Sequence, residues 1–130
     1  LLVRMKLGGA YDTGANYAFH ATRQTQSAAT YSGAAGSGQT GINVGNCGTT
    51  EAASGQFTFK ISTPSSTTLA KTVVWTGGSV SLAADTNVLG GTGSNTAVTA
   101  LTGVRFSPDG AGTITGTFRL YGISNSKERP

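Results

Sequence analysis

The sequence predicts an all-β fold, a single antiparallel β-sandwich of jelly-roll type, from three observations. Gly, Thr and Ser dominate the 130 residues with 20, 21 and 13 copies, and they favour turns and strands over helices. Apolar and polar residues alternate in several short runs, which is the pattern of half-buried strands. Turn-forming segments separate these runs, as in sandwiches and jelly rolls. We expect one domain over residues 1–123, lacking the upstream strands of a longer protein, and a polar tail over residues 124–130.

Two strands are expected near the start, over residues 1–7 and 16–23. Each places alternate apolar side chains on one face: Leu1, Val3 and Met5 in the first, and Tyr17, Phe19 and Ala21 in the second. Residues 8–15 contain three Gly and an Asp and are interpreted as a hairpin loop. The first strand is expected at a sheet edge, where it pairs with upstream chain or a neighbouring subunit.

The middle of the chain carries the strongest hairpin signal. Residues 56–62 and 69–76 alternate in apolar character, and a turn that contains Pro64 joins them. Residues 32–55 have few apolar side chains and predict either a functional loop or a weak strand. After the strand over residues 69–76, Gly77–Gly78 is expected to lead into a separate short strand over residues 79–83, followed by a Gly-rich loop over residues 85–95.

Two further strands complete the expected fold. Residues 97–106 alternate around Gly103, which is interpreted as a β-bulge. After a Pro-Asp-Gly turn, residues 113–123 are expected to form the last strand. Its apolar face is expected to complete the core with Ile114, Phe118 and Leu120.

Charge and hydropathy exclude several partners. The net charge of +4 comes from 9 Lys and Arg spread along the chain against 5 Asp and Glu, so no nucleic-acid partner is predicted. No apolar run approaches the roughly 18 residues of a membrane span, and no membrane insertion is predicted. The single cysteine, Cys47, has no partner for an internal disulfide, which fits assembly in a reducing cytoplasm.

One short motif suggests catalysis. Asp12-Thr13-Gly14-Ala15 matches the catalytic loop of retroviral-type aspartic proteases, which need two carboxylates that share one proton. A hairpin turn is the preferred interpretation, because no buried apolar strand leads directly into the Asp, and Asp and Gly are common turn residues. An aspartic-protease-like hydrolase is kept as the last alternative.

No catalytic, metal-binding or cofactor-binding residue is predicted elsewhere. Residues 36–41 match the GxGxxG spacing of dinucleotide sites, but no predicted strand and helix flank them to hold a pyrophosphate. His20 is the only histidine and is expected on an exposed strand face, so a zinc site would need distant ligands. Cys47 is interpreted as an inert small residue in a loop.

Aromatic side chains are the candidate ligand contacts. Tyr11, Tyr31 and Trp75 are proposed as a platform for a sugar, because rigid rings supply contact area and nearby amides and hydroxyls supply hydrogen bonds. For Trp75 a place in the core is favoured, since it lies in the predicted hairpin. A glycan-binding module is therefore the second alternative, and buried rings would contradict it.

The end of the chain resembles a group of tailed-bacteriophage structural proteins. Residues 116–123, Gly-Thr-Phe-Arg-Leu-Tyr-Gly-Ile, resemble the closing strand of that group, and looser similarity covers residues 2–17, 62–71 and 104–114. The resemblance implies a tail-fibre, head-fibre or capsid-decoration component of the virion, assembled in the bacterial cytoplasm, with no catalytic residues and no cofactor. The partners it implies are other copies of this chain in a trimer, other virion proteins and a host-surface glycan.

Overall fold

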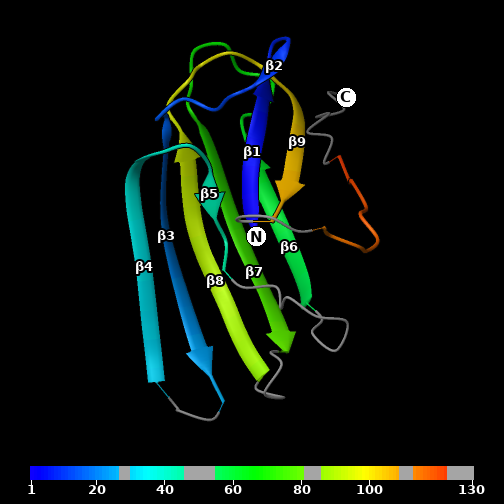
Figure 1. The fold of residues 1–130 in the computed structure, drawn as a ribbon. Helices are drawn as coiled ribbons and strands as arrows, with labels where there is room; N and C mark the ends of the chain where they lie inside the picture. Colours follow the sequence, from blue (N-terminus) through cyan, green and yellow to red (C-terminus); the bar gives the residue numbers. More distant parts are fainter. Residues whose placement is uncertain (27–29, 46–54, 81–85, 109–112, 123–130) are drawn as a thin grey trace, which may run out of the picture.

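The computed structural model describes residues 1–26, 30–45, 55–80, 86–108 and 113–122, and its regular structure over these residues consists of strands (Figure 1). The strands are β1 (Leu2–Leu7), β2 (Ala10–Tyr11), β3 (Tyr17–Thr25), β4 (Thr30–Gln39), β5 (Ile42–Asn43), β6 (Gly55–Ser62), β7 (Lys71–Val80), β8 (Thr86–Asn95) and β9 (Leu101–Ser107).

The strands form two antiparallel sheets, which confirms the all-β sandwich. A five-stranded sheet has the order β4-β3-β8-β7-β6. In the four-stranded sheet, β1 pairs with β9 along one edge and with the short β2 and β5 along the other. Figure 1 shows β1, β5 and β9 lying across the face of the larger sheet. The jelly-roll order of the strand connections is more specific than a two-sheet sandwich and stays a prediction.

The core lies between the facing sides of the two sheets. Alternation in β7 explains its inner side, because Val73 and Trp75 are buried whereas Val74 between them is half exposed. The buried hydrophobic cluster draws on both sheets and on the chain that follows β5: Val3, Met5, Ile42 and Val44 on one side, and Tyr17, Ala21, Val73 and Trp75 on the other.

Glycines in β8 make room for large core side chains. A Cβ at Gly91 would overlap the Trp75 ring and the His20 carbonyl oxygen, and a Cβ at Gly93 would lie 2.8 Å from Ile42 Cδ1. These close approaches require glycine at both positions. The expected loop over residues 85–95 is therefore wrong from Thr86 onward, because the segment is a strand between β3 and β7.

Two expectations for the first half of the chain are also wrong. The first strand lies in the interior of its sheet, since β1 has neighbours on both sides. Residues 8–15 do not close a hairpin between the strands expected over residues 1–7 and 16–23. Gly8 and Gly9 instead join β1 to β2, which pair antiparallel, and the chain then crosses to β3 in the other sheet. Of the weak segment 32–55, the part through Gln39 lies in β4 and pairs with β3.

The hairpin prediction for residues 56–62 and 69–76 is confirmed by the antiparallel pair β6–β7, in which Phe59 faces Trp75. Gly77–Gly78 does not separate two strands, because β7 continues through Val80; residues 81–83 of the expected short strand lie outside the described residues. The bulge beside Gly103 is confirmed, since the β1–β9 register shifts between Lys6 and Leu7.

The expected last strand is not a strand in this structure. Over residues 113–122 the segment has no strand partner among the described residues. Its predicted core side chains are in contact with solvent: Ile114 is 38% exposed, Phe118 61% and Leu120 96%. Without a neighbouring strand, an apolar face of this kind has no surface to cover it. Residue 123 and the tail over residues 124–130 lie outside the described residues.

Candidate functional site

Three inward-facing polar side chains lie side by side across one end of the five-stranded sheet. Asn95 of β8 pairs with Tyr17 of β3 on one side and with Lys71 of β7 on the other. All three side chains are fully buried. Since buried polar groups need hydrogen-bond partners, the partners of this polar row (Tyr17, Asn95, Lys71) determine whether it can carry chemistry.

The Asp12 carboxylate lies beside the polar row and is surrounded by donors. Asn95 Nδ2 donates to Oδ2 at 2.7 Å, Gly14 N–H donates to Oδ1 at 2.9 Å, and Asn16 Nδ2 contacts both oxygens at 3.2 and 3.1 Å. Burial raises the pKa of Asp12, but the hydrogen bonds from Asn95, Gly14 and Asn16 together hold it below its ordinary value of 3.8. The bond from Gly14 closes a local turn at this motif, as preferred over a catalytic loop, but the turn lies in a crossing between the sheets and not in a hairpin.

The Tyr17 hydroxyl connects the two sheets. It accepts a hydrogen bond from the Met5 N–H of β1 at 2.8 Å and donates to the Asp12 carbonyl oxygen at 3.1 Å. Burial raises the pKa of this phenol above its usual 10.0, although the bond from Met5 opposes the change. The hydroxyl is thus held in its neutral form as a link between strands.

The Lys71 ammonium is held by backbone carbonyl groups. Its Nζ donates to the carbonyl oxygens of Ser66 at 2.7 Å, Leu69 at 2.8 Å and Val98 at 3.4 Å. Three acceptors match the three N–H donors of a lysine. The side chain therefore fastens the β6–β7 turn and the segment after β8 to the inner face of the sheet.

The polar row therefore has a structural role in this geometry. Its hydrogen bonds join residues 12–16, 66–69 and 96–98 to one end of the sandwich. The sequence reasoning did not single out Lys71 or Asn95. A signal existed for Lys71, because it occupies the inward position of the alternation that continues with Val73 and Trp75; the sequence offered no comparable signal for Asn95.

The predicted aromatic platform does not form. Trp75 is 1% exposed and belongs to the core, so its role as a ligand contact is wrong and the core interpretation is confirmed. Tyr31 is 76% exposed near the start of β4, whereas Tyr11 lies in the other sheet on β2. Figure 1 shows β2 and the first residues of β4 at opposite ends of the molecule. The Tyr11 ring is flanked by Lys6 Nζ at 6.0 Å and Arg105 Cζ at 5.8 Å from its centroid.

The remaining motifs acquire no ligand site within the described residues. The GxGxxG spacing over residues 36–41 falls on the end of β4 and the turn before β5. His20 is exposed on β3, as expected, and Cys47 lies outside the described residues. In the part of the chain that the structure describes, no three His, Cys, Asp or Glu side chains are placed to hold a metal ion.

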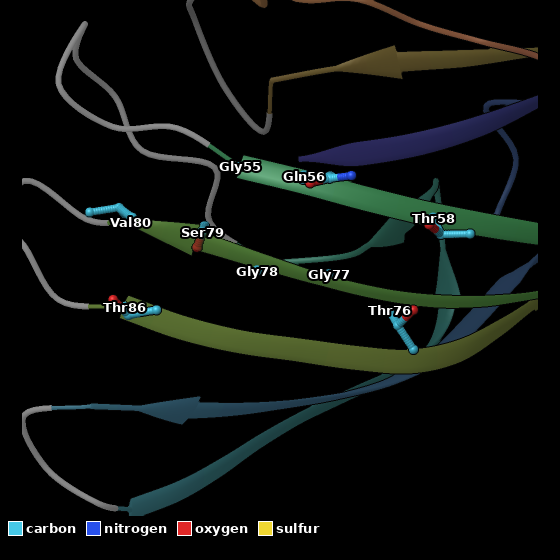
Figure 2. A pocket seen from close by; sticks show the side chains of 9 residues that line it. All are labelled: Gly55, Gln56, Thr58, Thr76, Gly77, Gly78, Ser79, Val80 and Thr86. Atoms are coloured by element: carbon cyan, nitrogen blue, oxygen red, sulfur yellow. The ribbon is translucent and has the colours of Figure 1, made fainter.

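A shallow hollow lies on the face of the five-stranded sheet that points away from the core, with a volume of about 520 Å³ (Figure 2). Thr58 and Thr76 face each other across β6 and β7, and Gly78 leaves the floor without a side chain. Figure 2 shows the residues that line it: Gly55, Gln56, Thr58, Thr76, Gly77, Gly78, Ser79, Val80 and Thr86. Its side chains offer hydroxyl and amide groups but no ionisable group.

Four phenylalanine rings form a continuous series that leads from β6 to β9 and on to residues 113–122. The centroid distances are 6.1 Å for Phe57–Phe59, 5.0 Å for Phe59–Phe106 and 5.3 Å for Phe106–Phe118. We name these four residues the aromatic seam. The rings of Phe57, Phe59 and Phe106 are only partly buried, so the seam is an incompletely covered part of the core.

Comparisons with known proteins give no guide to the function of the chain. No protein-family model, curated protein or solved structure matches the chain. Within the described ranges, no helix is long and apolar enough to cross a membrane. The aromatic seam and the segment over residues 113–122 are taken as the candidate functional surface, because Phe118, Leu120 and Tyr121 are exposed beside partly buried rings.

Proposed function

We propose that the chain is a structural component of a tailed-bacteriophage virion, displayed on the outside as a fibre, spike or decoration module of jelly-roll type. In this role it acts by oligomeric assembly, with copies of the chain joined as a trimer, and it performs no catalysis. The observation that carries the proposal is the exposed apolar surface of residues 113–122 beside the aromatic seam. Phe118, Leu120 and Tyr121 are 61%, 96% and 78% exposed, and contiguous exposure of this kind marks interaction surfaces.

Two features support a particle component over a free binding protein. The resemblance of residues 116–123 to the closing strand of phage structural proteins falls on the same exposed segment. Assembly of several copies also converts weak contacts into firm attachment, because each further contact forms at a high effective concentration. A module whose described hollow is shallow gains most from being repeated.

The test is the composition and structure of purified virions. Quantitative mass spectrometry of gradient-purified particles is expected to find several copies of the chain per particle, and cryo-electron microscopy is expected to place them in symmetric outward clusters. An abundant host cytoplasmic protein, measured in the same fractions, controls for contamination. Recovery of the chain only in the unassembled fraction of the lysate would overturn the proposal.

A glycan-binding module is the second candidate, and the hollow on the outer face of the five-stranded sheet favours it. Its hydroxyl and amide groups suit the hydroxyl groups of a sugar. A glycan array followed by titration of the best ligand tests the idea. Thr76→Val removes one hydroxyl group from the lining and is expected to weaken binding about tenfold. Thr92→Val, on the neighbouring strand but outside the lining, is the matched control.

A further inference from the structure

We infer that residues 113–122 are an assembly strand, which pairs with the free edge of β6 in a second copy of the chain. The inference rests on the proposed function, because it explains how copies would be joined. Among the described residues, β6 pairs with β7 on one side only. An unpaired strand edge offers a row of backbone donors and acceptors to another extended segment.

The assembly strand has the sequence pattern of a strand but has no strand partner among the described residues of its own chain. Ile114, Phe118 and Leu120 occupy alternate positions, with Gly116 completing the series, and Thr and Arg side chains occupy the positions between. Such a period of two, rich in Thr and aromatic residues, favours an extended conformation with one apolar face. All side chains of the segment are nevertheless exposed.

The edge of β6 suits this apolar face better than the other exposed edges do. The inward positions of β6 carry Phe57, Phe59 and Ile61, which are only partly buried, and the strand runs eight residues without a bulge. In contrast, β9 contains the register shift beside Gly103, and bulges disfavour the addition of a further strand. The inward positions of β4 carry Gly36 and other small residues, which offer little apolar area.

The aromatic seam marks where the added strand would lie. Phe118 already stacks on Phe106 of β9, whose ring lies 5.0 Å from that of Phe59 on β6. Within one chain the segment reaches the seam through this ring, while Leu120 and Tyr121 stay in solvent. A strand from a second copy, laid along β6, would cover the seam over its length, so a second copy is the occupant that we infer.

The contact joins two different surfaces, since the donated strand and the accepting edge are separate parts of the chain. Copies joined in this way either exchange strands reciprocally or close into a ring. A ring of three would produce the trimer of the proposed function. Each copy would then bury apolar area at the seam that the isolated chain leaves open.

Native mass spectrometry and hydrogen exchange of the full chain, over a range of protein concentrations, test the inference. We expect multimers to appear as the concentration rises. The backbone amides of residues 113–122 and 55–62 are expected to gain protection together over the same concentrations, because they would pair with each other. Protection of residues 113–122 in a single chain, independent of concentration, would show pairing within the chain and would overturn the inference.

A matched pair of variants makes the test specific. Leu120→Asp places a charge on the apolar face of the assembly strand, whereas Leu69→Asp places the same charge at another exposed leucine, 56% exposed before β7. Leu120→Asp is expected to raise the dissociation constant of the multimer at least tenfold, and Leu69→Asp is expected to leave it unchanged. Since both leucines are exposed, each variant is expected to fold, as its circular dichroism spectrum will show.

The failure of this inference is distinguishable from the failure of the proposed function. Multimers that resist Leu120→Asp would overturn the assembly strand but leave assembly of copies intact. A chain that stays a monomer at every concentration would also overturn the assembly strand. Presence of the chain in purified virions is measured independently and decides the proposed function.

Discussion

The polar row and the aromatic seam differ in how far the chain's own atoms contact their side chains. At the polar row the chain supplies every group itself: Asn95 binds Asp12, Tyr17 binds Met5, and Lys71 binds three carbonyl oxygens. At the seam, partly buried rings border solvent and Leu120 is 96% exposed. The difference teaches that this fold satisfies its buried polar groups with its own atoms but leaves large apolar side chains exposed at the seam.

The two regions also differ in what their chemistry can specify. Hydrogen bonds at the polar row have fixed directions, so they set which segments meet. The seam offers apolar area, which is non-directional and is worth about 1.5–3 kcal/mol for each large side chain that becomes buried. A region left apolar and open in this way can drive association once a strand edge supplies the direction.

Removal of a large side chain from each region is expected to produce the largest contrast. Trp75→Ala should lower the free energy of unfolding by about 3–5 kcal/mol, because it empties a fully buried site. Phe118→Ala should change it by less than about 1 kcal/mol at concentrations where the chain is a monomer. Urea unfolding at low protein concentration measures both. Equal losses would show that the seam is as important to the fold as the core.

A second variant at the same position sharpens this contrast. The Trp75 indole Nε1 is buried without a hydrogen-bond partner among the described residues. Trp75→Phe keeps most of the ring and removes this unpaired donor, so its loss of stability should be clearly smaller than that of Trp75→Ala.

The second-largest effect is expected at Lys71. Lys71→Met keeps most of the buried stem but leaves the carbonyl groups of Ser66 and Leu69 without their donor. The free energy of unfolding should fall by about 2–3 kcal/mol, which is the value of hydrogen bonds to a charged group. Lys60→Met is the control, because Lys60 is exposed on β6 and should change stability by less than about 0.5 kcal/mol. An unchanged free energy of unfolding for Lys71→Met would show that Lys71 does not stabilise the fold.

Gly90 and Gly91 are neighbours in β8 whose Cβ positions point to opposite faces of the larger sheet, so alanine substitutions compare the two faces. Gly91→Ala should lower the free energy of unfolding by about 1–3 kcal/mol, because the new Cβ would overlap the Trp75 ring and a backbone oxygen. At Gly90 the nearest atom to a new Cβ is the Trp75 carbonyl oxygen at 3.6 Å, an ordinary contact. Gly90→Ala should therefore leave stability unchanged or slightly raised. Similar losses at both positions would contradict the packing described for β8.

The sequence predicted some strands of this fold correctly and missed others. Alternation sufficed for the β6–β7 hairpin and for β1, β3 and β9, because their apolar side chains carry the period of a strand. It failed for β8, whose glycines are explained by Trp75 and Ile42 packing over them, a fact of tertiary structure. It also failed for residues 113–122, where the pattern of a strand is present but none of the described strands pairs with the segment.

The candidate site was harder to predict than the fold. The turn interpretation of Asp12 was available, since Asp two residues before Gly is a common turn signal. Asn95 binds the same carboxylate from 83 residues away, and no local pattern reports such a contact. The partial burial of the aromatic seam depends in the same way on how the edges of β6 and β9 come together.

The smallest predicted effect is the pH-dependent contribution of the Asp12 carboxylate to the free energy of unfolding. Hydrogen bonds hold the folded-state pKa of Asp12 below its ordinary value of 3.8, although burial opposes them. A depressed carboxylate pKa adds stability at pH values above the unfolded-state value, and this stability is lost as the pH falls through the folded-state value. Its contribution should stay below about 1 kcal/mol, because the carboxylate is partly exposed and solvent screens it.

Urea unfolding of the wild-type chain and of Asp12→Asn, each at pH 7 and pH 3, measures this contribution. The wild-type chain should be the more stable of the two at pH 7, and the difference should shrink at pH 3, where the carboxylate begins to take up its proton. Comparison with the variant cancels the titration of the other acids. A difference that grows toward low pH would mean that the carboxylate is destabilising when ionised. In that case burial would outweigh the bonds from Asn95 and Gly14, and the polar row would be a strained region rather than the closed end of the sandwich.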